Sequence, residues 1–346
     1  GGASFPSSVK LLLASNQTIS TLIINGGECE PYLTSDDLLM RERPDAIIRG
    51  ARLIQYIIKA EKIAVVIEDN KMAAIEAIRK SSADYGDIEV TVVPTRYPMG
   101  SAKQMIQAVT KKEVPAGGRS SDVGVLVHNV ATAQAISQCL TENTPLISRI
   151  VTVSGGAVAQ PQNVEVLVGT PISYLLDHCG GLKKTPARLL MGGPMMGQIM
   201  PSDQVPIIKG AGGVLALLED EINDTSSSPC IRCGRCVEAC PMGLMPLEIA
   251  NHARSQEFEG ANKFGLTDCI LCGSCAYVCP SHIPLVHYFQ YAKGEISRQK
   301  AIDKRTEYTR TLSQNRRQRK EQEALAKEAA KAAKAKRRKR STEKSG

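Results

Sequence analysis

The sequence predicts three small domains of different fold class, followed by a charged tail. We expect an α/β domain at residues 1–148, a small α+β domain at 149–222, an α-helical, cysteine-rich domain at 223–296 and the tail at 297–346. Strand and helix patterns alternate in the first part, glycine pairs punctuate short strands in the second, and eight of the eleven cysteines lie in the third. A chain of 346 residues is also too long for one ordinary core.

The composition excludes several classes of protein. With 42% hydrophobic and 23% charged residues, the chain has the make-up of a globular protein. No apolar run reaches the roughly 18 residues of a membrane-spanning helix, and no signal-peptide pattern is present. The scarcity of aromatic residues argues against a base-stacking surface, so we expect no nucleic-acid partner. Because the chain starts at Gly1, we expect it to be a piece of a longer protein.

The first domain alternates strand patterns with amphipathic helix patterns. The expected strands are 21–24, 62–67, 88–93 and 124–128, and the expected helices are 45–59, 71–80, 102–109 and 130–140. The segment 62–67 is apolar and rich in β-branched residues, as a buried parallel strand should be. This alternation predicts a Rossmann-like, doubly wound fold, in which ligands bind at the carboxyl ends of the strands.

Polar loops follow three of the four expected strands. They are Asn25–Pro31, Tyr97–Gly100 and the pair His128 and Asn129. The opening segment Gly1–Lys10 is rich in glycine and small hydroxyl residues and ends in a lysine, a composition suited to cradling phosphate. A plain turn is an equally good interpretation of that segment alone.

The second domain has short strands separated by glycine pairs. We expect strands at 150–154, 164–168 and 187–191 and one helix at 172–179, a pattern that suggests a β-grasp-like α+β fold. Residues 224–228 are expected to be a linker.

The third domain contains two cysteine tracts with the same spacing. Cys230–Pro241 and Cys269–Pro280 both read C-x2-C-x2-C-x3-C-P, the spacing of bacterial two-cluster ferredoxins. In that pattern the first three cysteines bind one cluster and the fourth binds the other cluster. Gly234 and Gly273 allow the backbone to curl around the sulfides.

The spacing therefore predicts two [4Fe-4S] clusters with crossed ligands. We assign one cluster to Cys230, Cys233, Cys236 and Cys279, and the other to Cys240, Cys269, Cys272 and Cys275. Zinc sites and disulfides are the alternatives, although zinc would leave two cysteines of each tract surplus, and disulfide scaffolds are small and secreted. Of the other three cysteines, Cys139 and Cys179 are expected to be buried thiols, whereas Cys29 lies in a polar loop.

The tail contains all the excess positive charge of the chain. From Arg310 onward there are 14 Lys or Arg and 4 Asp or Glu, against 29 and 31 in the first 309 residues. Residues 321–340 are strong helix formers without an apolar stripe, which predicts a solvated helix or a disordered segment. Contact with an anionic membrane surface is the functional alternative, and nucleic acid ranks third.

Several segments together carry a resemblance to a known family. They are GGASFPSSVK, NGGECEPYLTSDD, RYPMGSAKQ, HNVATAQAI, GGPMMG and the two cysteine tracts. On these segments the chain resembles the C subunit of the Rnf/Rsx electron transport complex and, more distantly, the flavin-bearing NADH-oxidising subunit of respiratory complex I. The resemblance implies that the second domain is the soluble-ligand-binding β-grasp domain of that family.

The resemblance also implies roles for individual residues. Gly1, Gly2 and Lys10 would hold the phosphate or ribityl part of FMN, and Asn129 would meet the phosphate side. Asn25, Glu28 and Glu30 would line the flavin and nicotinamide pocket, with the two glutamates as the catalytic-site residues that position the nicotinamide. Phe5 would stack on the adenine of NADH, and Tyr97 and Gly100 would sit over the nucleotide.

The chemistry of the predicted cofactors leads to the same function. NADH gives two electrons together, whereas an iron–sulfur cluster carries one, so the two must be joined by a converter such as a flavin. We expect an NADH-linked electron-transfer subunit of an ion-translocating complex, peripheral to the cytoplasmic face of the bacterial inner membrane and bound to other subunits. The alternatives are a soluble diaphorase-type subunit of a hydrogenase or dehydrogenase, and a non-enzymatic redox sensor.

Overall fold

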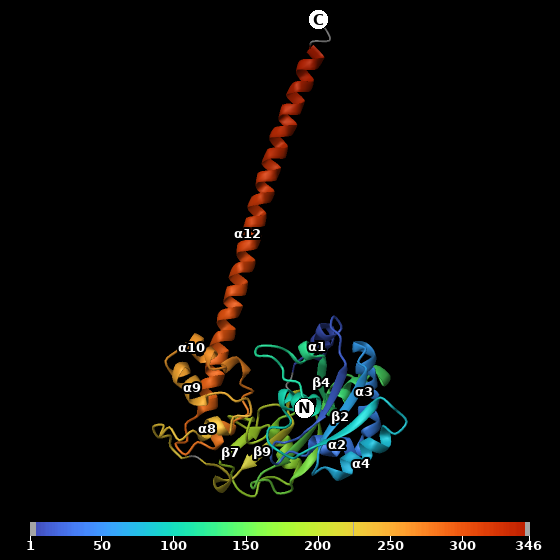
Figure 1. Ribbon diagram of the computed structural model, residues 1–346, viewed down its shortest axis with the longest axis vertical. Helices are drawn as coiled ribbons and strands as arrows, with labels where there is room; N and C mark the ends of the chain where they lie inside the picture. Colours follow the sequence, from blue (N-terminus) through green and yellow to red (C-terminus); the bar gives the residue numbers. More distant parts are fainter. Residues whose placement is uncertain (1–4, 224, 343–346) are drawn as a thin grey trace. The chain divides into compact units, whose positions relative to one another are not determined.

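The computed structural model describes residues 5–223 and 225–342, with side chains up to residue 334. Gly1 and Gly2 of the expected phosphate cradle lie outside the described residues. The chain divides into two units between Phe289 and Gln290. The first unit contains two β-sheets and the cysteine-rich helices (Figure 1).

Four parallel strands form the sheet of the first domain. Their order is β3 (Ile88–Val93), β2 (Lys62–Glu68), β1 (Thr21–Gly26), β4 (Val125–Asn129). All four expected strands are confirmed, with boundaries within two residues. Since the strands are parallel, the loops that follow them lie at one edge of the sheet.

Helices cover the two faces of this sheet unequally. One face packs against α1 (Ser7–Ala14), α2 (Ser35–Glu42), α3 (Pro44–Ile58), α4 (Met72–Ser81) and α6 (Val130–Thr141), and the other packs against α5 (Ala102–Thr110). The alternation of side chains along β1 explains this, because Leu22 and Ile24 join the first core while Ile23 joins the second. The sequence did not predict α1 and α2, and Lys10 lies within α1 rather than at the end of a loop.

The second domain is built on a mixed five-stranded sheet. The strand order is β6 (Gln162–Leu167), β5 (Ser148–Ser154), β9 (Gly213–Leu217), β7 (Arg188–Met191), β8 (Gln198–Ile199). Helix α7 (Ile172–His178) contributes Ile172, Leu175 and Leu176 to its core. The three expected strands and the helix are confirmed, whereas β8 and β9 were not predicted. Two short 3-10 helices, η1 (Ser120–Val123) and η2 (Glu219–Glu221), complete the two domains.

The cysteine-rich domain repeats one backbone pattern. Its elements are α8 (Arg235–Glu238), α9 (Pro246–Arg254), α10 (Phe258–Lys263), η3 (Leu266–Asp268) and α11 (Ser274–Tyr277). Gly234 and Gly273 have φ angles of 79° and 83°, and each precedes a short helix. Arg232 and Leu271 occupy equivalent positions of the two tracts and also have positive φ, at 55° and 57°. The backbone curl expected at both glycines is therefore confirmed.

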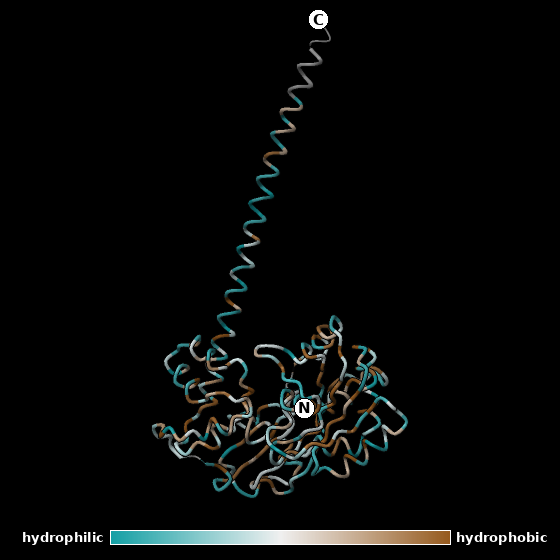
Figure 2. Tube along the Cα trace, viewed as in Figure 1, coloured by the Kyte–Doolittle hydropathy of each residue, from teal (hydrophilic) through white to brown (hydrophobic). Residues whose placement is uncertain are grey.

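The last helix, α12 (Leu285–Thr342), is continuous. The predicted boundary at residue 296 between the cysteine-rich domain and the tail falls inside this helix, because the Ala, Glu, Lys and Arg residues that follow are strong helix formers and prolong it. Figure 2 shows this helix mostly in hydrophilic colours, and residues 297–334 are all exposed. Within the described part of the chain, no helix combines the length and the apolarity that crossing a bilayer requires.

Candidate functional site

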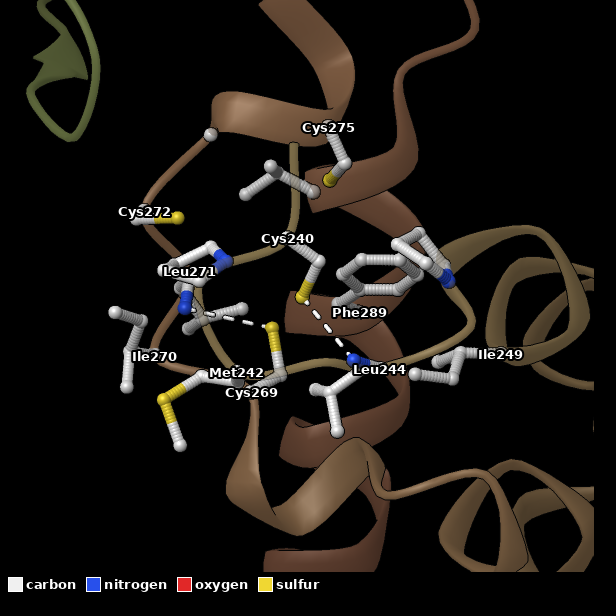
Figure 3. Close-up of a pocket in the computed structure, with 14 residues that line it drawn as sticks. Cys240, Met242, Leu244, Ile249, Cys269, Ile270, Leu271, Cys272, Cys275 and Phe289 are labelled. Carbon is white, nitrogen blue, oxygen red and sulfur yellow. Dashed lines mark hydrogen bonds between the residues drawn. The ribbon is translucent and has the colours of Figure 1, made fainter. Parts of the chain in front are cut away.

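Cysteines from both tracts line one pocket in the cysteine-rich domain. Cys240 of the first tract lies there with Cys269, Cys272 and Cys275 of the second. Leu244, Ile249 and Phe289 supply apolar walls, and Figure 3 shows the four sulfur atoms around this space. The four residues are those assigned to one cluster on spacing alone, so the structure brings them together as the crossed pattern requires.

The environment of these thiols suits a group that compensates negative charge. Burial, together with the smaller effects of the nearby Cys269, Cys272 and Cys240, raises the pKa of Cys275 to about 12. Four thiolates in an apolar pocket repel one another unless a cation or an iron–sulfur cluster neutralises them. The donor set therefore fits a [4Fe-4S] cluster, the group that the spacing predicts.

The remaining cysteines of the tracts form a second group near the surface. Burial raises the pKa of Cys236, and the charges of Cys279 and Cys230 raise it too, which places these three thiols near one another. Cys233 belongs to the same tract, and Cys230 and Cys233 are exposed, whereas Cys272 and Cys275 are buried. We call the group of Cys240, Cys269, Cys272 and Cys275 the inner group and the other four the outer group.

Backbone N–H groups point at sulfur atoms in both groups. Arg232 N–H donates to Cys230 Sγ at 3.3 Å, and Leu271 N–H donates to the equivalent Cys269 Sγ at 3.4 Å. Such bonds stabilise thiolates and tune cluster potentials. All eleven cysteines are free. Within residues 5–223 and 225–342, no three His, Cys, Asp or Glu side chains are arranged to hold a single metal ion.

The loops at the carboxyl edge of the first sheet are tied to one another. Asn25 Nδ2 donates to Gly100 O at 2.8 Å, and Asn25 Oδ1 accepts from Gly27 N at 2.8 Å. A Cβ on Gly100 would lie 2.5 Å from Gly27 O and 3.1 Å from Cys29 Sγ, so the two loops touch through backbone. Asn25 and Gly100 therefore lie together, and their polar groups bond each other.

Glu28 is bound to the start of helix α2. Its carboxylate accepts from Ser35 Oγ at 3.1 Å, Asp36 N at 3.0 Å and Asp37 N at 3.2 Å. Burial is the main cause that raises the pKa of Glu28 to about 7, and the nearby Asp36 raises it as well. The residue satisfies N–H groups that a helix start leaves open, which spacing alone did not reveal.

Glu30 joins the first domain to the second. Its carboxylate accepts from Met195 N at 3.0 Å and from Met196 N at 2.9 Å, in the loop between β7 and β8. A Cβ on Gly193 would lie 2.3 Å from Glu30 Oε2, so this loop requires glycine there. Burial raises the pKa of Glu30. The segment GGPMMG, which the sequence singled out only through the resemblance, thus acts as the partner of Glu30.

Other expected cofactor residues are spread around this edge. Lys10 Nζ donates to Val127 O, and burial lowers the pKa of Lys10. Asn129 Nδ2 donates to Asp36 Oδ2 at 2.6 Å, and its Oδ1 accepts from Ala131 N at 2.9 Å at the start of α6. Phe5 is 56% exposed and is the most peripheral of the described set.

Two buried polar side chains at this edge have no hydrogen-bond partner among the described residues. They are Glu68, with both carboxylate oxygens, and His128, with Nε2. Burial raises the pKa of Glu68 although the charge of Lys71 opposes this, and burial with the charge of Lys10 lowers the pKa of His128 to about 3. Unsatisfied polar atoms at a ligand edge fit a site that binds a polar cofactor. The sequence analysis missed Glu68, although it directly follows a buried strand.

The inner group lies against this edge of the first domain. Tyr97 Oη donates to the carbonyl oxygen of Cys272, and burial raises the pKa of Tyr97, with smaller contributions from Glu30, Cys272 and Cys29. A Cβ on Gly273 would lie 2.8 Å from Met195 O. The loops of Tyr97, Glu30 and Cys272 therefore meet at one junction.

Helix α5 supports the same junction from the first domain. Lys103 Nζ pairs with Asp268 Oδ1 at 2.8 Å, and Gln104 Nε2 donates to Pro241 O at 2.9 Å. Both partners flank cysteines of the inner group, since Asp268 precedes Cys269 and Pro241 follows Cys240. Three independent contacts thus fix the inner group beside the α/β domain.

Family models match three successive segments of the chain. Residues 1–138 match a Nuo51 FMN-binding domain, residues 150–198 match an SLBB domain, and residues 229–283 match a 4Fe-4S dicluster domain. The FMN-binding match covers the carboxyl-edge loops, and the dicluster match covers both cysteine tracts. These assignments agree with the flavin and the two clusters that the sequence predicted.

Solved structures share the fold. The chain resembles a chain in the crystal structure of an NAD+-reducing [NiFe]-hydrogenase in the H2-reduced state, with a TM-score of 0.55 and 18% identity. That match covers 85% of this chain and 57% of the other. At this identity the likeness concerns the fold alone.

The most informative relatives are C subunits of ion-translocating complexes. The chain is 50% identical over 298 residues to the C subunit of the ion-translocating oxidoreductase complex of Rhodobacter capsulatus, and 42% identical over 346 residues to that of Erwinia tasmaniensis. It is 44% identical over 296 residues to the C subunit of the proton-translocating ferredoxin:NAD(+) oxidoreductase complex of Clostridium ljungdahlii. These matches cover 86%, 100% and 85% of this chain, but only 57%, 42% and 65% of the respective relatives. They confirm that most of this chain shares its family with the C subunits of the ion-translocating oxidoreductase complexes.

Proposed function

We propose that this chain transfers electrons between NADH and a redox partner, as a subunit of an ion-translocating complex. The FMN-binding and dicluster matches and the name shared by relatives at 42–50% identity support this proposal. When bound, the flavin supplies the exchange between two-electron and one-electron chemistry, and the clusters carry single electrons.

Each cluster is proposed to take its ligands from both tracts. Cys240, Cys269, Cys272 and Cys275 hold the inner cluster, and Cys230, Cys233, Cys236 and Cys279 hold the outer cluster. The mutual proximity of Cys240 and the second tract supports the crossed assignment. Because Cys230 and Cys233 are exposed, electrons would pass to a redox partner from the outer cluster.

The flavin is proposed to bind at the carboxyl edge of the first sheet. Gly1, Gly2, Lys10 and Asn129 would hold its phosphate and ribityl side, and Asn25, Tyr97 and Gly100 would border the ring and nucleotide, with Phe5 toward the adenine of NADH. Glu28 and Glu30 bond backbone N–H groups of α2 and of the Met195 loop. We therefore propose them as positioning residues that fix the shape of the pocket, and their catalytic role stays a prediction.

The strongest support for the proposal is the hydrogen bond that the Tyr97 hydroxyl donates to the carbonyl oxygen of Cys272. It joins the loop that borders the flavin edge to the peptide of an inner-group ligand. Electron transfer needs close approach of the two cofactors, and this contact holds their two loops together.

We also propose domain boundaries for the chain, its location in the cell and its contact with the membrane. The sheet of β5–β9 with α7 would be a β-grasp domain, and the boundaries at 148, 222 and 296 would separate the functional parts. The chain would lie on the cytoplasmic face of the bacterial inner membrane, bound to other subunits. The basic part of α12 would contact anionic lipid headgroups, each Lys or Arg near the surface adding about 1 kcal/mol.

Anaerobic purification followed by an NADH titration tests the proposal. The protein should contain FMN and about eight irons per chain, and NADH should bleach the flavin and then reduce the clusters. In Tyr97→Phe, flavin reduction should keep its rate while cluster reduction slows, and Tyr174→Phe on the exposed face of α7 is the control. Irons without flavin and without NADH oxidation would refute the proposal and favour a redox sensor.

The soluble diaphorase-type subunit is the second candidate, because the hydrogenase structure shares the fold. Salt-sensitive association with membranes separates the two, since a peripheral subunit is released as ionic strength rises. The higher identity to the ion-translocating relatives favours the first candidate.

A further inference from the structure

Glu68 is a buried acidic residue whose carboxyl group no contact within the fold satisfies. It ends strand β2 at the carboxyl edge of the first sheet, and it is 0% exposed. Neither of its two carboxylate oxygens has a hydrogen-bond partner among the residues that the structure describes. Burying a carboxyl group without partners is costly, so a ligand that supplies hydrogen-bond donors would account for it.

The strand directs this side chain toward the proposed flavin edge. Ala64 and Val66 of β2 belong to the core under α5, and because side chains alternate along a strand, Glu68 leaves the sheet on the same face. Burial, with a smaller effect of the charge of Glu68, raises the pKa of the Cys29 thiol to about 11. Cys29 Sγ in turn accepts from Gly100 N at 3.3 Å. The carboxyl group therefore lies near both loops that border the proposed flavin site.

The charged neighbours of Glu68 do not replace a ligand. Burial raises the pKa of Glu68 and the charge of Asp69 adds to this, whereas the charge of Lys71 opposes it. Lys71 nevertheless makes no hydrogen bond to either carboxylate oxygen. Asp69 is engaged elsewhere, since its Oδ1 accepts from Thr95 N at 3.0 Å and from Thr95 Oγ1 at 2.6 Å. Two acceptor atoms thus remain open at this edge of the sheet.

The topology indicates which donors could reach these oxygens. The strand order β3-β2-β1-β4 matches the start of the order in dinucleotide-binding folds, in which an acidic residue after the glycine-rich turn binds a ribose hydroxyl of NAD. Here Gly27 follows β1 and Glu68 ends the next strand, although two helices rather than one lie between these strands. Adjacent hydroxyl groups of a sugar supply two O–H donors, one for each carboxylate oxygen.

We propose that Glu68 binds vicinal hydroxyl groups of a nucleotide and thereby determines which nucleotide the site accepts. This inference rests on the proposed function, because NADH and FMN are the ligands proposed for this edge. Both carry such hydroxyls, NADH on its riboses and FMN on its ribityl chain. At the ribose, the carboxylate would repel the 2′-phosphate of NADPH, since like charges disfavour each other. At the ribityl chain, it would favour riboflavin over lumiflavin, which lacks that chain.

Equilibrium binding to the oxidised protein separates these two sources of hydroxyls. For ribose binding, Glu68→Gln in the FMN-loaded protein should weaken NAD+ binding roughly 10- to 100-fold and reduce the preference for NAD+ over NADP+. For ribityl binding, the same variant, depleted of flavin but with its clusters intact, should lose affinity for riboflavin and keep its affinity for lumiflavin. Glu89→Gln, at an exposed glutamate of the neighbouring strand β3, is the control and should change none of these affinities.

The wild-type protein decides the outcome if Glu68→Gln folds poorly. It should bind NAD+ more tightly than NADP+, or riboflavin more tightly than lumiflavin. Equal affinities within both pairs, or a folded Glu68→Gln protein that changes neither preference, would overturn the role of Glu68. Reduction of the flavin by NADH is measured on the same wild-type samples. Its absence would count against the proposed function, whereas reduction with both preferences unchanged in Glu68→Gln would count against the inference about Glu68 alone.

Discussion

Cys240 is the residue whose substitution best tests the crossed assignment of cysteines to the two clusters. It belongs to the first tract by sequence and to the inner group by position. We predict that Cys240→Ala lowers the iron content from about eight to about four per chain. Its electron paramagnetic resonance spectrum should match that of Cys272→Ala and differ from that of Cys233→Ala. Cys139→Ala, at an exposed cysteine of α6, is the control. A match to Cys233→Ala would refute the crossover.

Glu28 gives the stability of the protein a characteristic pH dependence. Burial raises its pKa to about 7 in the folded state, above the ordinary value of 4.5. Between these values the folded state binds more protons than the unfolded state, so the free energy of unfolding falls as pH rises from about 4.5 to 7. Glu28→Gln should flatten this slope in urea titrations at several pH values, with Glu76→Gln on α4 as the control. An unchanged slope would show that Glu28 does not titrate in this window.

For individual residues, the sequence predicts which side chains could bind a cofactor better than it predicts which groups those side chains contact in the fold. The spacing of the cysteines names all eight proposed ligands, because a cluster fixes the separation of its thiolates along the chain. The partners of Glu28 and Glu30 could not be predicted, since they are backbone N–H groups of α2 and of the Met195 loop. Glu68 escaped notice for a similar reason, because only burial shows that its carboxylate lacks a partner. Cys139, expected to be buried, is exposed, whereas Cys179 is buried as expected.

Among the elements, the contact of α3 with α6 depends on one glycine. A Cβ on Gly50 would lie 1.8 Å from the carbonyl oxygen of Ala133. Gly50→Ala should therefore destabilise the first domain by about 1–3 kcal/mol through overpacking, although alanine favours a helix by about 1 kcal/mol. Gly294→Ala is the matched control, because nothing lies within 4 Å of its Cβ position in α12 and only the helix-favouring effect remains. A rise of the urea midpoint in Gly50→Ala would contradict the close packing.

Long periodic elements were predictable, whereas short ones were not. The helices α3, α4, α5 and α6 follow from apolar residues at helical spacing. Helix α1 lies in a glycine-rich segment that also suits a phosphate loop, and α2 has only eight residues, with its start capped from Glu28. For the tail, the sequence predicts a solvated helix or a disordered segment. The tail is helical within α12 because its Ala, Glu, Lys and Arg residues have high helix propensity.

The basic tail is expected to determine how strongly the whole molecule binds to membranes that contain anionic lipid. Truncation after Lys300 removes the strongly basic part of α12, whose residues up to 334 are exposed. We predict that the truncated protein loses most binding to vesicles that contain anionic lipid and keeps NADH-dependent flavin reduction. Binding of the untruncated chain should weaken between low and high salt. Neutral vesicles are the control, and equal binding by both proteins would contradict a role of the tail.

The order of domains along the chain was predictable from composition and pattern, but their docking was not. Contacts such as Lys103 with Asp268 and Tyr97 with Cys272 join residues more than 160 positions apart. No local pattern encodes such pairs, because each contact forms only when two segments distant in the sequence pack together. The junction of the flavin edge with the inner group is thus a property of the folded molecule.

The proposed electron path requires that eight cysteines hold two iron–sulfur clusters beside the flavin edge. Iron and acid-labile sulfide analysis of anaerobically purified protein, combined with paramagnetic resonance after reduction, measures whether they do. We predict about eight irons and eight sulfides per chain, with the signals of two [4Fe-4S] clusters that interact magnetically. Zinc in place of iron, or disulfide-bonded tracts without sulfide, would rule out the two iron–sulfur clusters.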